Sequence, residues 1–226
     1  MKKTKMDYKK NKIINNVDKI PVQLNFGIML NTIKNPIIEK IEEQTNSSQD
    51  IVEDNIMFEM DSALNGSQIK LKYKYNLWSH DIYNKNWNID SYNKICQIDN
   101  ISDFWKLFNN FNKMNIRVMH FFFMKEGTEP VWEHESNRSG GVCSFKIEIN
   151  KALSLWEDLN SRMACNCLTN DAFDINGISI SPKNNWAILK IWNRNKENDL
   201  SIMLSKEVLE KYANLSIKYK NNEPEY

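Results

Sequence analysis

Two segments in the second half of the chain alternate strictly between apolar and polar residues, and this pattern constrains the fold most. In residues 143–149 the two alternating sets are Cys143, Phe145, Ile147 and Ile149 against Ser144, Lys146 and Glu148. In residues 186–192 they are Ala187, Leu189 and Ile191 against Trp186, Ile188, Lys190 and Trp192. A period of two is that of a β-strand with one buried face. The second strand therefore presents a lysine and two tryptophans on one side of a sheet.

Other segments have helical spacing. Asn100 is placed to cap a helix over residues 101–114, in which the apolar residues are Ile101, Phe104, Trp105, Phe108 and Phe111. Similar patterns predict a second helix near 152–163 and a third that begins after Ser205. Residues 118–124 predict a strand that is buried on both faces. Strands separated by helices, without Gly-rich phosphate loops, predict an α+β fold in which helices cover one face of an antiparallel sheet.

Composition excludes several classes of protein. A formal net charge of +1 argues against binding long nucleic acids mainly through phosphate neutralisation. The first residues lack the apolar stretch of a secretory signal, and no run approaches the roughly 20 apolar residues that span a bilayer. The four cysteines are scattered, so we expect reduced thiols in a cytosolic compartment and neither a metal site nor a cofactor. The abundance of Asn, Lys and Ile is typical of an AT-rich genome, such as that of a protist or a giant virus.

The chain divides near Gly66. Residues 1–65 mix Lys/Asn-rich and acidic stretches with short apolar clusters, and they lack long periodic segments. We expect an N-terminal extension that is flexible or wraps the core, followed by a single domain over residues 66–226.

The tryptophans suggest a more specific relationship. The chain contains seven tryptophans, which is more than packing alone would explain. A buried indole N–H needs a hydrogen-bond partner, so protein cores use tryptophan sparingly. In order, the chain contains Tyr75-Asn76-Leu77-Trp78, Trp87, the segment from Asn100 to Trp105, Glu129-Pro130-Val131-Trp132-Glu133, and Asn137-Arg138-Ser139-Gly140-Gly141. This series over residues 70–195 resembles the eukaryotic translation initiation factor 4E family, which binds the mRNA 5′ cap. The resemblance implies an eight-stranded curved antiparallel sheet, three helices on its convex face and a cap slot on its concave face.

The resemblance also assigns the cap slot. N7-methylated guanine is a delocalised cation that is attracted to indole faces, and the family correspondence places it between Trp87 and Trp132. Glu133 would accept the two N–H donors of the base, and Trp192 would contact the methyl group. Without the resemblance, Glu133 could equally be an ordinary surface carboxylate.

The predicted phosphate contacts depart from the family pattern. Lys183 takes the place of a usual Arg, and Lys190 shares a strand face with Trp192. Val142-Cys143 follows the glycine pair where Arg and Trp are usual, so Arg138 or Arg194 could substitute for the missing cation.

The resemblance further implies a partner site on the helical face, where a helix with a Tyr-x-x-x-x-Leu-apolar motif from an initiation scaffold or regulator would bind. The expected contacts are Ile101, Trp105, Leu155 and Leu159. Periodicity alone favours a core position for Trp105, and we assign Trp78 and Trp156 to the core.

The predicted function is cap binding and recruitment of an initiation scaffold in the cytoplasm, or in the host cytoplasm if the protein is viral. A cap-binding repressor is the alternative. A nucleotide-processing enzyme is a remote alternative. The only dense group of candidate catalytic side chains is His134 between Glu133 and Glu135, and the family resemblance explains this group as part of the cap-binding loop.

Overall fold

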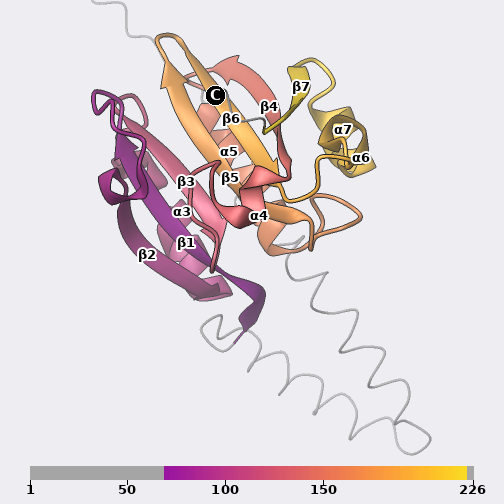
Figure 1. The fold of residues 1–226 in the computed structure, drawn as a ribbon, viewed down its shortest axis with the longest axis horizontal. Helices are drawn as coiled ribbons and strands as arrows, with labels where there is room; N and C mark the ends of the chain where they lie inside the picture. Colours follow the sequence, from indigo (N-terminus) through magenta and orange to yellow (C-terminus); the bar gives the residue numbers. More distant parts are fainter. Residues whose placement is uncertain (1–68, 223–226) are drawn as a thin grey trace, which may run out of the picture.

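Residues 69–222, which the computed structural model describes, form a curved antiparallel sheet backed by helices (Figure 1). Within this range the sheet has seven strands in the order β2-β1-β3-β5-β6-β4-β7. The strands are β1 (Lys70–Asp81), β2 (Asn93–Asn100), β3 (Met119–Lys125), β4 (Gly141–Glu148), β5 (Ile175–Lys183), β6 (Trp186–Asn193) and β7 (Ser216–Asn221). The α+β class is confirmed, with seven strands in place of the expected eight. The predicted extension 1–65 lies outside the described residues.

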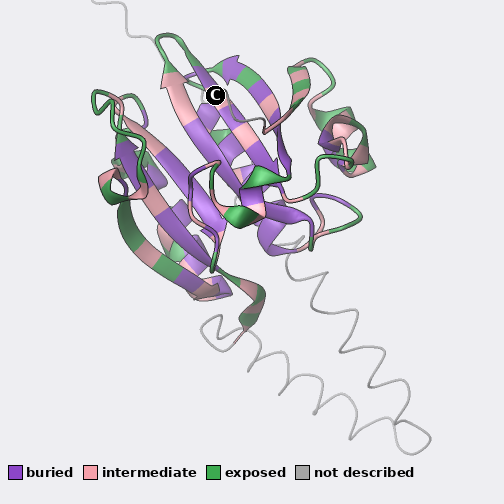
Figure 2. Cartoon of the chain, viewed as in Figure 1, coloured by how far each residue is buried: buried purple, intermediate pink, exposed green. Residues whose placement is uncertain are grey.

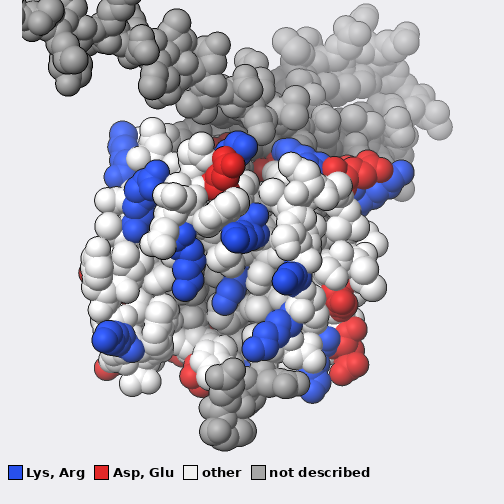
Figure 3. Space-filling model, turned by 90° about the horizontal axis from the view of Figure 1, so that it is seen from above, with Lys and Arg blue, Asp and Glu red and all other residues white. Residues whose placement is uncertain are grey.

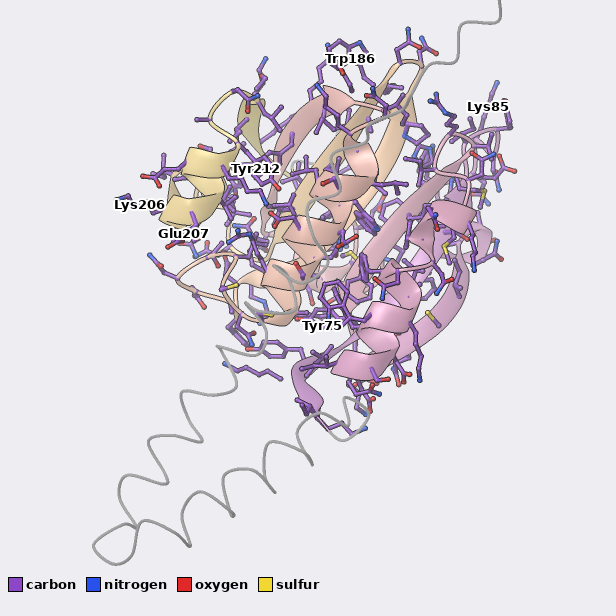
Figure 4. The ribbon with its side chains drawn as sticks, turned by 180° about the vertical axis from the view of Figure 1, so that it is seen from behind. Tyr75, Lys85, Trp186, Lys206, Glu207 and Tyr212 are labelled. Carbon is purple, nitrogen blue, oxygen red and sulfur yellow. The ribbon has the colours of Figure 1, made fainter. Side chains whose placement is uncertain are left out.

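The helices lie mainly behind the sheet, where Figure 4 shows α3 and α5 across its back. They are α3 (Ile101–Phe108), α4 (Glu135–Arg138), α5 (Ala152–Ala164), α6 (Leu200–Met203) and α7 (Lys206–Lys211), with 3-10 turns η1 (Ile89–Ser91) and η2 (Phe111–Lys113). None of the described helices is long and apolar enough to cross a membrane.

The first predicted helix begins where expected but ends early. The Asn100 side chain accepts a hydrogen bond from the Asp103 backbone N–H at 2.9 Å, which is the predicted N-cap. The α-helix stops at Phe108, and after two turn residues the 3-10 turn η2 follows. The Asn110 side-chain amide donates to the Lys106 carbonyl at 2.8 Å, so it occupies a carbonyl that the next turn of an α-helix would use.

Two apolar clusters lie on opposite faces of the sheet. In keeping with this, the central strands are coloured as buried along most of their length (Figure 2). The large one fills the space between the sheet and the helices, and it includes Trp156 as predicted. The smaller one, called here the front cluster, lies on the other face. Its buried members are Tyr92, Phe122, Met124, Val131, Val142 and Trp192, with Trp78, Ile89 and Trp132 packed against them. Trp78 is a packing residue, as predicted, but it packs against the front cluster because its position on β1 turns it to that face.

A buried carboxylate joins α5 to α7. Asp158 accepts hydrogen bonds from Arg162 Nε at 3.1 Å, Lys211 Nζ at 2.9 Å and the Tyr212 hydroxyl at 2.7 Å. The Asp158 side chain is almost fully buried, and Arg162 is nearly so. Each partner satisfies a lone pair that would otherwise be lost from water, so this group fixes α7 to the back of the domain.

We predict that Asp158→Ala lowers the free energy of unfolding by roughly 3–5 kcal/mol, because it leaves the Arg162 charge buried without a partner. Tyr212→Phe, which removes one hydrogen bond to a charged group, should cost only about 1.5–3 kcal/mol. Urea denaturation of the wild type and both variants measures these values. Equal losses in the two variants would show that the ion pair adds nothing beyond the hydroxyl contact.

Candidate functional site

Trp87 stands in the turn between β1 and β2, and 48% of its surface is exposed. The turn is built from short polar side chains that bond to the backbone two residues on: Asp81 accepts from Tyr83, Asn84 from Asn86 and Asn86 from Asn88. Asn and Asp favour turns for this reason, which explains the Asn-rich sequence around the tryptophan.

His80 supports the Trp87 ring. The buried imidazole stacks on the indole with ring centroids 4.3 Å apart and planes 15° apart. Its Nε2 lies 2.7 Å from the Asn86 carbonyl oxygen, which can only accept, so Nε2 is the donor. One indole face is therefore covered by the imidazole, while the exposed fraction leaves the other available to a flat ligand.

Trp132 and Glu133 come from the segment between β3 and α4. Asn137 holds this segment through its side-chain amide, which donates to the Glu129 carbonyl at 2.9 Å and to the Val131 carbonyl at 2.7 Å. Asn176 on β5 in turn donates to the Asn137 side-chain oxygen at 2.9 Å. These contacts fix the loop on the front of the sheet, and Figure 1 shows α4 lying across that face.

The indole of Trp132 is half-buried against the front cluster, and the Glu133 side chain is exposed. Burial, followed by the negative charge of Glu133, raises the pKa of Tyr92 above its usual range. The Glu133 carboxylate therefore lies close enough to Tyr92, a member of the front cluster, to affect its pKa. Among the described aromatic pairs, none joins Trp87 to Trp132, so the two indoles have not collapsed onto each other.

Trp192 is a member of the front cluster. It is buried, and its Nε1 donates to the Ser179 hydroxyl on the neighbouring strand at 3.0 Å. The predicted alternation along β6 is confirmed, because Ala187, Leu189 and Ile191 are completely buried in the main core while Trp192 belongs to the front cluster. Val142 is also in the front cluster, and Cys143 is completely buried behind it, so the usual Arg and Trp are replaced by two packing residues.

Lys183 and Lys190 converge on His120. Burial and the nearby His80, Lys183 and Lys190 lower the pKa of His120 to about 4. Burial, Lys183 and Lys220 also lower the pKa of Lys190. Among the salt bridges within residues 69–222, none involves either of these two lysines. Such a group of crowded cations favours a polyanionic ligand.

Two arginines considered as substitutes are engaged elsewhere. Arg138 donates from Nη2 to the Glu133 carbonyl at 3.1 Å. Arg194 lies over the Phe173 ring at 4.3 Å from its centroid. Neither contact precludes a phosphate, but each gives the side chain a local structural role.

The predicted partner residues are on the back of the sheet and are at most 7% exposed. They are Ile101, Trp105, Leu155 and Leu159. Leu155 and Leu159 belong to the main core and are almost completely buried between α5 and the sheet, so they have little surface to offer a partner. Trp105 is the most exposed of the four, and its buried Nε1 has no hydrogen-bond partner among the described residues.

The comparison with known families decides the relationship. The family model described as "Eukaryotic initiation factor 4E" matches residues 70–225. The chain belongs to the eukaryotic initiation factor 4E family.

Similar relatives and structures agree with this family. The rice "Eukaryotic translation initiation factor NCBP" is 31% identical over 45% of this chain and 43% of its own length. The Arabidopsis thaliana protein of the same name is 26% identical over 66% of this chain and 69% of its own length. An initiation factor 4E homologue of Acanthamoeba polyphaga mimivirus is 31% identical over 30% of this chain and 26% of its own length. The chain thus spans less than half of the rice relative.

The fold is that of solved 4E structures. C. elegans eIF4E-3, in complex with the 4E-binding protein Mextli and a cap analog, superposes with a TM-score of 0.59 at 20% identity, over 70% of this chain and 98% of that one. Ascaris suum eIF4E-3 with m7G cap also gives 0.59 at 20% identity, over 69% of this chain and 92% of that one. At this low sequence identity, the superposition establishes the shared architecture alone.

Sequence reasoning missed His80 and His120 as site residues. Both face the front next to Trp87, with the His120 ring centroid 5.3 Å from the indole. The alternation of His120, Phe122 and Met124 along β3 was the signal that could have placed His120 on the front. The prediction of a strand buried on both faces is confirmed for residues 121–124, and His120 lies at the less buried end of that strand. His134, considered as a remote catalytic candidate, instead accepts from the Ser136 backbone N–H at 3.3 Å and caps α4. No group of three metal-binding side chains was found among the described residues.

His120 gives a prediction about pH. Its folded-state pKa of about 4 lies below the usual ~6.5 of an unfolded chain, so the unfolded state binds more protons between these values. The contribution is complete above pH ~6.5 and is lost as the pH falls toward the folded value. Replacing His120 by Gln should therefore make the pH dependence of unfolding shallower, by at most about 1.4 kcal/mol per pH unit. Urea unfolding of both proteins across this range is the measurement, and identical slopes would contradict the assignment.

Proposed function

We propose that the front face binds the 7-methylguanosine cap of mRNA and that the protein acts in translation initiation. The observation that carries the proposal is Trp87, an indole that is stacked on His80 and still has 48% of its surface exposed. An exposed aromatic fixed in this way costs little further ordering when a flat ligand stacks on it.

The surrounding side chains support a methylated guanine. A cationic base gains from stacking between Trp87 and Trp132, at roughly 1–3 kcal/mol per base–aromatic contact. Glu133 would accept N1–H and N2–H of the base as a charge-assisted pair. Trp192, oriented by Ser179, would contact the methyl group, and Lys183 and Lys190 would contact the triphosphate. The protein would bind this ligand without catalysing a reaction.

Similar proteins support the role in initiation. The rice, wheat and Arabidopsis relatives bear the name of translation initiation factors, which favours initiation over the repressor alternative. The C. elegans neighbour is in complex with both a 4E-binding protein and a cap analog, so a second, helix-bearing partner is part of the proposal. A protein of this role would work in the cytoplasm, or in the host cytoplasm if it is viral.

The proposed cap slot predicts a preference for methylated nucleotide. Binding of 7-methyl-GTP should quench tryptophan fluorescence and be at least about tenfold tighter than binding of GTP, a difference of about 1.4 kcal/mol. Trp87→Ala and Trp132→Ala should each remove most of this affinity, and Glu133→Gln should reduce it through lost charge assistance. Tyr83→Ala is the matched control, because Tyr83 is an exposed aromatic residue in the same turn as Trp87. Equal affinity for the two nucleotides would exclude the cation sandwich.

The proposed partner site predicts that the two faces can be separated by mutation. A peptide with the Tyr-x-x-x-x-Leu-apolar motif should bind α3 next to Ile101 and Trp105, because an indole on a rigid helix anchors a helix placed in a groove. Trp105→Ala should abolish peptide binding and leave 7-methyl-GTP affinity near that of the wild type.

Trp105→Phe is the companion variant for this test, since it keeps most of the buried area but removes the unpartnered Nε1. If the N–H serves the partner, Trp105→Phe should weaken peptide binding while the melting temperature stays close to that of the wild type. Parallel loss of cap and peptide binding in Trp105→Ala would contradict the separation of the sites.

A further inference from the structure

The register of the sheet gathers lysines beside the proposed cap slot. Directly opposed residues of an antiparallel pair project to the same face. Ser144 on β4 is opposed by Lys190 on β6 and by Lys218 on β7. Val142, a member of the front cluster, is opposed by Trp192 and by Lys220. We call the front-facing set Lys146, Lys190, Lys218 and Lys220 the lysine ladder.

The ladder carries charge that no described carboxylate neutralises. The salt bridges among residues 69–222 involve other lysines, and Glu148, the acidic residue on this face of β4, pairs with Lys151 at 3.3 Å. Burial and the positive charges of Lys183 and Lys220 lower the pKa of Lys190, although Lys220 lies on β7, on the far side of β4. Like charges that are held together on a rigid sheet destabilise it slightly, and an anion would relieve that cost.

An exposed tryptophan stands at the end of the same face. Trp186 begins β6 and is 41% exposed, and Lys146 Nζ lies over its ring at 4.6 Å from the centroid. Trp186 and Trp192 are on the same side of β6, and the strand rise places them ~20 Å apart. This distance is longer than a single nucleotide, and residues of the lysine ladder lie between the two tryptophans.

The surface around this end of the sheet is predominantly basic. Figure 3 looks down on the end that carries the β5–β6 turn in Figure 1, and Lys and Arg side chains are spread across it. The acidic side chains in that view lie mainly toward its margins.

We propose that the lysine ladder and Trp186 bind the RNA that follows the cap, with the ladder contacting phosphates and the Trp186 indole stacking on a base. The inference rests on the proposed cap function, because the cap places the start of the RNA at Trp192. Sequence-independent binding of single strands combines these two elements, a basic track and an aromatic platform. The ladder includes the proposed phosphate residue Lys190, so the RNA would stay on the same face of the sheet when it leaves the cap slot.

The test compares three ligands on the full chain: 7-methyl-GTP, a capped RNA about six nucleotides long, and the same RNA without a cap. The wild type should bind the capped RNA about tenfold more tightly than 7-methyl-GTP. In Lys146→Ala/Lys218→Ala this advantage should fall close to one. The salt dependence for the capped RNA should become shallower by about 1.4 in the log–log slope, from about 0.7 for each lost contact. Trp186→Ala should reduce the advantage about fivefold or more.

The matched control is Lys113→Ala/Lys206→Ala, which removes two exposed lysines away from this face. Figure 4 places Lys206 at the outer edge of the back, far from Trp186. The control should keep the full advantage of the capped RNA.

The outcomes separate the two proposals. If 7-methyl-GTP binds but the wild type gains nothing from the attached RNA, or if the ladder variant keeps the gain, the RNA path is excluded and cap binding stands. If 7-methyl-GTP does not bind, both proposals fail. Competition at the ladder by a poly-glutamate peptide, with no gain from RNA, would identify an acidic protein segment as the occupant and overturn the inference.

Discussion

The pleat of β6 is the constraint on which the rest of the structure depends. Its odd residues, Ala187, Leu189 and Ile191, are fully buried against the helices, so its even residues must face the other way. A slip of one residue would place Lys190 in the main core and move Trp192 from the front cluster to the back. Stability of the core and chemistry of the front face are thus set by the same register.

The front face joins two different physical requirements. An indole that receives a cationic base has to be rigid and exposed, and His80 together with the asparagine-rich turn provides this for Trp87. A polyphosphate requires concentrated positive charge, and Lys183 and Lys190 would supply it around His120. Burial and the nearby cations lower the pKa of His120 to about 4, so its imidazole is neutral at physiological pH. Val142 and Cys143 follow the glycine pair, and the cations next to the proposed cap slot come from β5 and β6.

The back of the sheet is more closed than the family resemblance implied. Leu155 and Leu159 are core residues, and Trp105 is 7% exposed while its N–H lacks a described partner. A partner on this face would therefore have to bind mainly through the α3 edge, and the unsatisfied indole N–H is the group that would gain most from an acceptor.

The sequence alone determined the fold class, the strands over 143–149 and 186–192, the Asn100 cap and the family, because local periodicity and ordered aromatic motifs depend on neighbouring residues. It could not determine that His80 supports Trp87, that His120 lies among the lysines, or that Trp78 faces the front. These relations depend on the pairing of β1 with β3 and on loop closure through Asn137 and Asn176. Pairing of β1 with β3 places His80 opposite His120, 40 positions further along the chain, and only the tertiary structure decides that these residues meet.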